Sequence, residues 1–322
     1  MATQLQQMIE AQPAALRAVA GLDVAAFAER LSGARRVHVV GTGTSFHAAE
    51  LGALLLERGG VRAIATPSAD FARWRPEPAA DEAVILISHT GTTPYALTVR
   101  ERARSGGVPL VGIAGERSGW DEAILTPTHE RSETYTVSYT AALGVLALLA
   151  DALAGTGTGP DALRGAAADV ERVIATPDVE RVDPPRRALA IVGPGPWGVT
   201  AREGALKLRE SSHVLAEGFD AERLLHGAAV PYGSDDVLIA LEPAADSDGL
   251  TGAVAAAGEA AGMTTFVFED AGRSQDPFIA QISATARLQL LASHMSARNR
   301  TDPDTAIVGP WAAEPMWALG GP

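Results

Sequence analysis

The chain has 322 residues, of which 47% are hydrophobic and 20% charged, and it carries a net charge of −13 with no cysteine. This composition is typical of a packed soluble protein, and the length predicts two domains because one hydrophobic core seldom grows beyond about 250–300 residues. Lack of cysteine excludes disulfides, thiolate metal sites and cysteine nucleophiles, and an acidic chain without a basic stripe argues against nucleic-acid binding.

The sequence also bears on the compartment of the protein. The first residues lack the basic start and continuous apolar core of a signal peptide. No run approaches the ~18 uncharged apolar residues that a membrane helix needs. We therefore expect a cytoplasmic protein with no membrane partner.

Strands and helices are predicted to alternate along the chain after a helical segment over residues 1–34. Apolar runs predict strands at 37–40, 62–66, 83–87, 109–113, 188–192, 237–241 and 264–268. Helices are predicted from the first strand to about Arg58, from the third to about Ser105, over 137–154, and from the strand at 188–192 to about Leu215. Because each strand is almost purely apolar, the pattern predicts parallel sheets covered by helices on both faces.

A glycine-rich stretch, Gly155–Pro160, predicts a linker in the middle of the chain. The order of elements begins again after it, which indicates two similar α/β units near 22–157 and 160–322. We therefore predict a first domain over 1–157, with the N-terminal helical segment, and a second over 158–322.

The loop Ser88–Thr93 is the sharpest candidate for binding a ligand. It follows a predicted strand, has four hydroxyl side chains within six residues, and leads directly into a helix. Ligands of open α/β sheets bind beyond the carboxyl ends of strands, where helix-start amides and hydroxyls can hold a phosphate without a lysine. The alternative is a plain helix N-cap, which needs only one hydroxyl. Thr44 and Ser45, in the loop Gly41–Ser45, repeat the pattern with weaker spacing.

A dinucleotide site is an alternative in the second half of the chain. Gly193–Gly198 matches G-x-G-x-x-G between a predicted strand and helix, and Glu217 lies near the expected offset of about 20 residues. Pro194 and Pro196, however, remove two amide donors that a pyrophosphate would use. We therefore expect no cofactor.

A metal site is a second alternative. Glu210 and His213 are three residues apart on a predicted helix and could share a metal ion. No third or fourth ligand is evident, and such a pair is more often simply a surface or core feature. We expect no metal.

Several motifs resemble those of sugar isomerase (SIS) proteins. Ser88-x-Thr-Gly-x-Thr93 resembles the S-x-S-G-x-T phosphate loop of SIS domains. Other segments resemble, in the right order, the isomerase half of glucosamine-6-phosphate synthases: Glu133–Ser138, Glu203–Glu210, Ala216–Glu217, Leu225–Gly227 and Leu288–His294. The resemblance implies an α/β fold of two tandem SIS-like αβα domains, each with a mostly parallel sheet, in a homodimer with active sites near the interface.

The resemblance also implies roles for individual residues. Glu210 would be the base that moves a proton between C1 and C2, His226 from the partner subunit would help to open the sugar ring, and Lys207 would assist. The residues that would bind the sugar phosphate or lie close to it are Thr44, Ser45, Ser88, His89, Thr90, Thr93, Ser138 and Glu217.

The chemistry of these residue types fits the implied reaction. Exchange between an aldose and a ketose needs a base beside a carbonyl, and a carboxylate with a raised pKa can serve. Ring opening needs a group that gives and takes protons near neutral pH, as histidine does. Without the resemblance, Glu210 would be read as a solvated helix carboxylate. His226, before Gly227, would be read as a favourable residue at a helix C-terminus.

Other positions depart from the family pattern. No glutaminase domain accompanies these motifs, so the full synthase reaction is not expected. Lys207 is the only lysine, and Trp311 stands near the position of the family's imine-forming lysine, so a Schiff base at that position is not available. His89 replaces a usual glutamine, and Thr140 replaces a lysine. The second unit has no serine-rich loop, so one phosphate site per chain is expected.

Together these features predict a phosphosugar isomerase or deaminase that acts on an amino-sugar or ketose 6-phosphate. A deglycase of phosphorylated fructosamines would need the same glutamate and histidine. The alternative from a different class is a sugar-phosphate sensor without catalysis, although the residues before the first strand are too few and not basic enough for a helix-turn-helix domain.

Overall fold

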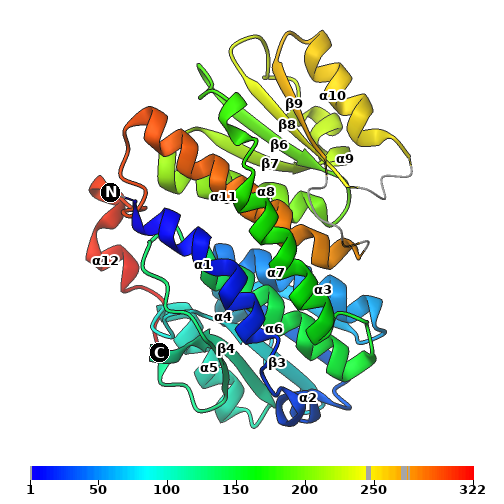
Figure 1. Cartoon of the computed structure of the whole chain (residues 1–322). Helices are drawn as coiled ribbons and strands as arrows, with labels where there is room; N and C mark the ends of the chain where they lie inside the picture. The colour runs from blue at the N-terminus through cyan, green and yellow to red at the C-terminus, as the bar shows by residue number, and fades with distance from the viewer. Residues whose placement is uncertain (1, 244–247, 270–273, 275) are drawn as a thin grey trace. The chain divides into compact units, whose positions relative to one another are not determined.

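The computed structural model describes every residue except 1, 244–247, 270–273 and 275 (Figure 1). The chain forms two compact units. The first-sheet unit comprises 14–130, 137–164 and 307–322, and the second-sheet unit comprises 1–13, 131–136 and 165–306. The units therefore do not follow the single division expected after residue 157, because the chain passes between them several times. Two helices, α1 (Gln4–Val19) and α7 (Pro160–Ala175), each contribute residues to both units.

The first-sheet unit is built on five parallel strands in the order β2-β1-β3-β4-β5. Helices α2, α3 and α6 contact one another and the strands, and α4 and α5 form a separate contacting pair. Phe71 of α4 and Val99 of α5 share a buried cluster with Val84 and Leu86 of β3. The bounds are β1 (Arg36–Gly41), β2 (Ala63–Pro67), β3 (Glu82–Ile87), β4 (Leu110–Gly115), β5 (Ala123–Thr126), α2 (Ala25–Leu31), α3 (Thr44–Arg58), α4 (Ser68–Arg73), α5 (Pro94–Ser105), α6 (Val137–Ala154) and α12 (Glu314–Trp317).

The second-sheet unit has four parallel strands in the order β7-β6-β8-β9. Alternate residues of its strands pack to opposite sides. Leu189 and Ile191 share a buried cluster with α8 and α11, whereas Ala190 and Val192 share another with α10. The bounds are β6 (Leu189–Gly193), β7 (Ala216–Asp220), β8 (Val237–Glu242), β9 (Thr264–Glu269), α8 (Trp197–Ser212), α9 (Ala221–Arg223), α10 (Leu250–Ala260) and α11 (Pro277–Asn299).

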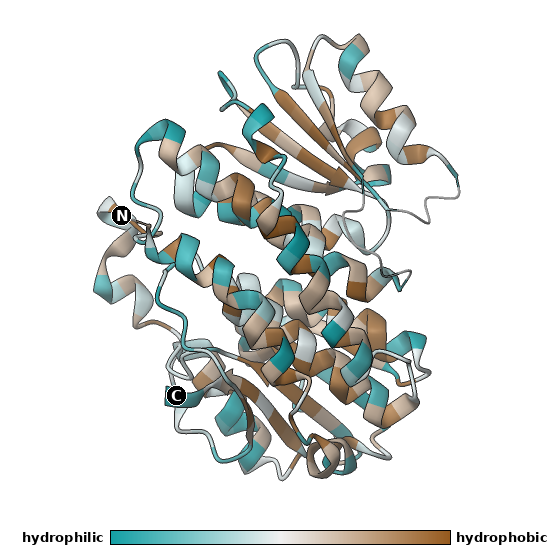
Figure 2. Ribbon diagram, viewed as in Figure 1, coloured by the Kyte–Doolittle hydropathy of each residue, from teal (hydrophilic) through white to brown (hydrophobic). Residues whose placement is uncertain are grey.

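Both sheets confirm the predicted α/β fold. Figure 2 shows hydrophobic residues along the strands of each sheet, as expected for parallel strands covered on both faces. The four strands of the second sheet repeat the order of the first four strands of the first sheet. This shared order agrees with two tandem αβα arrangements.

The sequence patterns missed two edge strands and several helices, among them α7, α10 and α11. The edge strand β7 reads Ala-Glu-Gly-Phe-Asp, and only its first residue is buried, so it lacks an apolar run. The strand β5 has only four residues, of which Leu125 is exposed. The long helix α11 was not predicted, and α8 ends at Ser212 because His213 adopts a left-handed conformation with φ of 55°.

The helix α6 corrects one expectation about membranes. It is long and apolar enough to span a membrane by length and composition, contrary to the expectation that no run approaches this limit. Within the structure, 78% of this segment is buried, as in the core helix of a globular protein. No other helix in the described part of the chain passes the same test.

Candidate active site

The loop Ser88–Thr93 continues directly from β3 in the first-sheet unit. The side chain of Ser88 is buried, and its amide donates to the carbonyl of Ile113 at 3.0 Å. Gly91 has a φ of 70°, and a Cβ atom there would lie 2.7 Å from the side chain of Ser118. A residue with a side chain would therefore be strained and crowded at this position, which explains the glycine.

The hydroxyls of this loop do not act as a helix cap. Thr93 precedes α5, but its side chain makes no capping hydrogen bond. Thr90 Oγ1 accepts from the amide and hydroxyl of Thr92 at 3.3 and 3.0 Å. The loop is therefore not a plain N-cap, because an N-cap would need the Thr93 hydroxyl to accept a hydrogen bond from an amide in the first turn of α5. Pro94 at the helix start has no amide hydrogen, but the other amides of the first turn lack intrahelical partners, as at any helix start, and such amides favour an anion.

The second candidate loop lies at the same edge of the first sheet. β1 ends at Gly41 next to β3, and Thr44 and Ser45 begin α3. A Cβ atom on Gly41 would lie 2.3 Å from the carbonyl oxygen of Ser45, so only glycine allows this turn. Because neighbouring parallel strands end at the same edge, the two loops flank one region. The structure thus places Thr44 and Ser45 beside the loop that contains Ser88.

The side chain of His89 is turned into the protein. Its Nε2 accepts a hydrogen bond from the amide of Glu130 at 3.3 Å, and its ring stacks on His129 with centroids 6.1 Å apart. Burial, and then the charge of His129, lower the pKa of His89 to about 4. His89 is therefore neutral near pH 7, with its proton on Nδ1, and it brings no positive charge to a phosphate.

This lowered pKa predicts a dependence of stability on pH. The unfolded chain binds a proton on His89 below the ordinary pKa of 6.5, whereas the folded chain does so only near pH 4. The stability contributed by neutral His89 is therefore fully present above pH 6.5 and is lost as pH falls toward 4. We expect the free energy of unfolding to fall by about 2 kcal/mol between about pH 7 and pH 5 through this residue. Urea titrations of His89→Gln should lack this part of the pH dependence, whereas His226→Gln, at an exposed position, should keep it.

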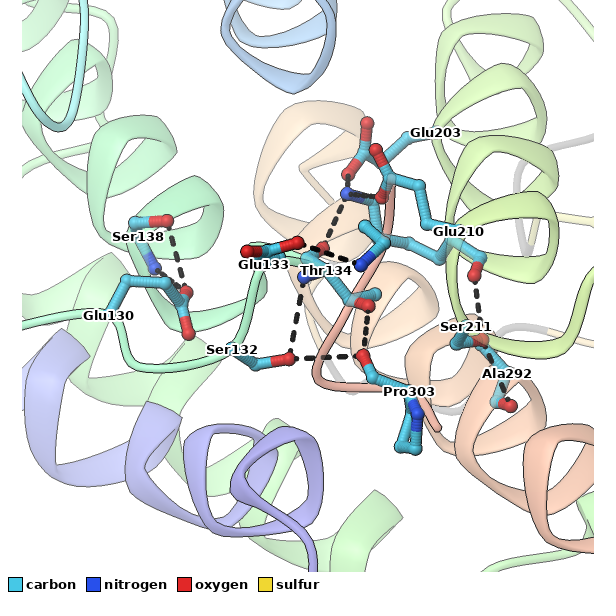
Figure 3. A network of polar contacts seen from close by, with 12 residues as sticks. Glu130, Ser132, Glu133, Thr134, Ser138, Glu203, Glu210, Ser211, Ala292 and Pro303 are labelled. Carbon is cyan, nitrogen blue, oxygen red and sulfur yellow. Dashed lines mark hydrogen bonds and ion pairs between the residues drawn. The ribbon is translucent and has the colours of Figure 1, made fainter. Parts of the chain in front are cut away.

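Ser138 lies at the start of α6 in the first-sheet unit and is largely buried. Its amide and its hydroxyl both donate to Oε2 of Glu130, at 3.2 and 3.1 Å (Figure 3). Glu130 is itself buried. A carboxylate therefore covers the first amides of α6, which is a favourable place for negative charge.

Lys207 lies at the centre of a buried network in the second-sheet unit. Figure 3 labels its partners Thr134, Glu203 and Glu210. The ammonium of Lys207 has no exposed surface and donates to Oε2 of Glu210 at 2.6 Å and to the carbonyl of Thr134 at 2.5 Å. Oε1 of Glu203, which is also fully buried, lies 3.5 Å from the same nitrogen. All three charged residues stand on α8 at spacings of three and four, which places them on one face of the helix.

The pKa of Glu210 depends on its burial and on this network of two carboxyl groups and one ammonium group. Burial raises that pKa, while Lys207 opposes the shift. The side chain of Glu210 remains 17% exposed, so it is not sealed within the core. A partly accessible carboxylate with a raised pKa is suited to accepting a proton from carbon.

His226 is exposed in the turn that follows α9. Its Nδ1 lies 2.9 Å from the carbonyl oxygen of Glu222, which can only accept, so Nδ1 carries the proton and Nε2 is the nitrogen left to react. Gly227, with a φ of 102°, interrupts the helical geometry within this turn, which ends at Ala228. The structural alternative considered for His226, a favourable histidine at the end of a helical turn before a glycine, therefore also agrees with the structure.

Glu217 has a structural partner in the second-sheet unit. The hydroxyl of Tyr232 donates to its Oε2 at 2.6 Å, and burial together with this carboxylate raises the pKa of Tyr232. Glu217 is the second residue of β7, so the carboxyl end of the strand is Asp220 instead. A dinucleotide site requires its acidic residue near that carboxyl end. The Gly193 turn does join a strand to a helix, but Glu217 does not complete the fingerprint.

The described residues contain no group of three or more His, Cys, Asp or Glu side chains able to hold a metal ion. Of the pair considered from the sequence, Glu210 binds Lys207, and His213 ends α8.

The structure thus groups the expected residues by unit. In the first-sheet unit, Ser45, Ser88, Thr90 and Thr93 lie in two loops at one sheet edge, and His89 is linked through Glu130 to Ser138. In the second-sheet unit, Glu210 and Lys207 are in direct contact, while His226 and Glu217 have other partners. The sequence analysis missed Glu130, Thr134 and Glu203. Of these, only Glu203 had a local signal, its position four residues before Lys207.

The C-terminal segment contacts α5, the helix that follows the Ser88–Thr93 loop. Thr98 of α5 donates to the carbonyl of Gly320 at 2.7 Å. Trp311 is 72% exposed, and its carbonyl accepts from the indole of Trp317 at 2.7 Å. The tryptophan that stands near the expected lysine position is therefore a surface residue.

Comparison with known proteins relates the chain to sugar isomerase domains. Residues 30–150 match the family model described as the SIS domain. The glutamine–fructose-6-phosphate aminotransferase (isomerizing) of Zymomonas mobilis is 28% identical over 313 residues, which cover 85% of this chain and 51% of that protein. Its counterpart in Pyrococcus horikoshii is also 28% identical, over 86% of this chain and 51% of that protein. The chain spans about half the length of these curated relatives.

Solved structures share the fold over nearly the whole chain. The tagatose-6-phosphate ketose/aldose isomerase of Escherichia coli has a TM-score of 0.80 at 19% identity, covering 97% of this chain and 98% of that chain. The C-terminal domain of glucosamine-fructose-6-phosphate aminotransferase from Francisella tularensis has a TM-score of 0.79 at 19% identity, with coverages of 95% and 98%. Glucosamine-6-phosphate deaminase from Thermotoga maritima has a TM-score of 0.78 at 20% identity, covering 94% of this chain and 97% of that chain. The match to the SIS domain family lies over the part of the chain that carries the Ser88–Thr93 loop.

Proposed function

We propose that this chain is a phosphosugar isomerase or deaminase that acts on an amino-sugar or ketose 6-phosphate. The observation that carries the proposal is the carboxyl group of Glu210, whose pKa is raised by burial and which is held by the buried Lys207. The curated relatives are isomerizing aminotransferases of fructose 6-phosphate, which supports the substrate class.

The proposed roles follow from the chemistry of each group. Glu210 removes a proton from the carbon beside the carbonyl and returns it to the neighbouring carbon, so that aldose and ketose interconvert. Lys207, beside it, stabilises its carboxylate form. His226 exchanges a proton at Nε2 during ring opening. The Ser88–Thr93 loop, together with Thr44 and Ser45, binds the 6-phosphate.

The specific reaction depends on the leaving group of the substrate. Release of ammonia from an amino sugar and removal of the amine from a fructosamine 6-phosphate both need the same proton transfer. An imine with a lysine at the family's C-terminal position is not part of the proposal, because the one lysine of the chain is Lys207 and its side chain is fully buried. Deglycase activity on a fructosamine 6-phosphate is a more specific form of the same proposal.

A second candidate function is sugar-phosphate sensing without turnover. The observation that favours it is the exposed Trp311, near the place where the resemblance puts a catalytic lysine. We also propose that the enzyme is cytoplasmic. The resemblance assigns His226 to the site of a partner subunit, so we propose in addition that the enzyme is a homodimer. Sedimentation of the purified protein tests the dimer, and a monomer would contradict it.

A product assay distinguishes the enzyme from the sensor. The substrates are glucosamine 6-phosphate, fructose 6-phosphate and a 6-phosphofructosamine conjugate, with ammonia, aldose and free amine as the products measured. Turnover of any one supports the enzyme. Binding of all three without turnover supports the sensor, and failure to bind any of them refutes both.

The phosphate loop gives a separate prediction. The double variant Ser88→Ala/Thr93→Ala should weaken binding of sugar 6-phosphates by at least about fivefold, because two neutral hydroxyl donors each contribute roughly 0.5–1.5 kcal/mol. Calorimetric titration with fructose 6-phosphate and with free fructose measures the effect. A double variant of helix α5 away from the loop, Thr98→Ala/Ser105→Ala, is the control. Normal binding by the loop variant would show that the phosphate binds elsewhere.

A further inference from the structure

The carboxylate of Glu130 has no role in the proposed reaction, yet it is buried beside a residue expected to contact the sugar. Both the amide and the hydroxyl of Ser138 donate to the same oxygen of Glu130, at 3.2 and 3.1 Å. Glu130 and Ser138 are 6% and 7% exposed. The two side chains are therefore held together in a protected place at the start of α6 (Figure 3).

The hydroxyl of a serine has one proton to donate and two lone pairs to accept. Oε2 of Glu130 accepts the hydrogen bond from Ser138 Oγ, so the single proton of Ser138 is committed to Glu130. What Ser138 can offer to a ligand is then a lone pair. A ligand atom in hydrogen-bond contact with Ser138 Oγ must accordingly carry a proton of its own.

The same pair is attached to the phosphate loop. His89 stands within that loop, and its Nε2 accepts from the amide of Glu130. A Cβ atom on Gly115 would lie 2.8 Å from the imidazole of His89, so the ring fits closely against β4 and has little freedom to move. The position of Glu130 is therefore fixed relative to the loop that binds the phosphate.

We propose that Glu130 is a positioning residue that fixes Ser138 as a hydrogen-bond acceptor and thereby selects phosphosugars that present a hydroxyl or ammonium group to it. The inference rests on the proposed function, because it takes Ser138 to contact the sugar. It adds the substrate class: polyhydroxy and amino sugars fit this contact, and a carbonyl or phosphate oxygen does not.

The carboxylate also gives the substrate a direction. A phosphate dianion placed against Ser138 would meet the negative charge of Glu130 in a buried setting, where like charges repel strongly. The phosphate is therefore kept to the Ser88–Thr93 loop, and the opposite end of the sugar faces Ser138. Glucosamine 6-phosphate presents an ammonium group, which is the donor best matched to a serine backed by a carboxylate.

The test uses a series of glucose 6-phosphates in which one hydroxyl at a time is replaced by fluorine, which cannot donate a hydrogen bond. Calorimetric titrations measure affinity for the wild type, Glu130→Gln, Ser138→Ala and the control Glu57→Gln, an exposed carboxylate on α3. In the wild type and the control, fluorination at one position should lower the affinity about tenfold, the size of one lost hydrogen bond. This factor is the fluorination penalty.

In Glu130→Gln this penalty should shrink to about twofold, because a glutamine amide can donate to Ser138 and free its proton. Ser138→Ala should shrink it equally, and the double variant should add nothing further. All variants should keep wild-type affinity for inorganic phosphate, which also shows that they are folded.

The outcomes separate this inference from the proposed function. Binding of the parent sugar phosphate with an unchanged penalty in Glu130→Gln overturns the inference alone. A wild type that binds inorganic phosphate but no phosphosugar overturns both. If Glu130→Gln does not fold, Ser138→Ala decides the matter, because an unchanged fluorination penalty in that variant contradicts the contact itself.

Discussion

Replacing Glu210 by glutamine should lower the rate of proton transfer by about 10²–10⁴-fold, the usual contribution of a positioned acid–base group. Glutamine keeps the shape of the side chain and can still accept from Lys207 through its amide oxygen, so the local packing should survive. Binding of the sugar phosphate should change little, because the phosphate loop belongs to the other unit. The readout is exchange of the C1 or C2 proton with solvent deuterium, followed by NMR.

The matched control is Glu217→Gln. Glu217 is a carboxylate of the same unit, accepts from the hydroxyl of Tyr232 at 2.6 Å and has an exposed side chain. Its replacement should reduce the exchange rate far less than that of Glu210. Equal losses for the two variants would count against Glu210 as the base, as would normal exchange in Glu210→Gln.

The raised pKa of Glu210 also sets the pH dependence of the rate. A base must be unprotonated to act, so the turnover rate should fall as pH decreases through the pKa of this group. Because burial raises that pKa, the fall should be centred above the ordinary value of 4.5. An acidic limb that lies below this value would show that another group limits the rate.

The sequence predicted those parts of the fold that depend on local patterns. Uninterrupted apolar runs located β3 and β8 to within one residue, because buried parallel strands need such runs. The edge strand β7 was missed because Glu217, Gly218 and Asp220 give it no run. The interleaved units could not be foreseen either, since the grouping of 131–136 with residues far along the chain depends on tertiary contacts.

The same distinction holds for the candidate site. The place of the Ser88–Thr93 loop between β3 and α5 could be predicted because strand, hydroxyls, glycine and helix start are consecutive in sequence. The partner of Ser138 could not, because nothing in the sequence around Glu130 indicates that its carboxylate turns toward α6. His89 was expected to hold the phosphate, but the direction of its ring depends on Gly115 and Glu130, which come from β4 and the segment after β5.

Charge explains why the proposed base needs its neighbours. Glu203 and Glu210 place two carboxyl groups around one ammonium group in a largely buried setting, so full ionisation of both leaves an excess negative charge. The excess favours protonation of one carboxyl group and contributes to the raised pKa of Glu210, because the charge of Glu203 acts in the same direction as burial. The reactivity proposed for Glu210 is therefore a property of the three residues together.

The same network predicts that the loss of Lys207 should destabilise the protein strongly. In Lys207→Met the carboxyl groups of Glu203 and Glu210 lose their ammonium partner, and the carbonyl of Thr134 loses its donor. Removal of one member of a buried ion pair costs about 3–5 kcal/mol. Urea unfolding near neutral pH should show a loss of this size, whereas Arg209→Met, an exposed cation on the same helix, should cost only about 1 kcal/mol.

Two further measurements identify the cause of that loss. Without the ammonium group, the folded state of Lys207→Met binds protons more tightly than the unfolded chain, so its stability should fall as pH rises from the unfolded carboxyl value of 4.5 toward the raised folded value. Adding Glu203→Gln removes one of the unpaired charges, so the double variant should be more stable than Lys207→Met. If instead the single variant unfolds like the wild type, the ammonium group does not compensate the buried carboxylates. A double variant weaker than the single one would mean that packing, rather than charge, dominates at Lys207.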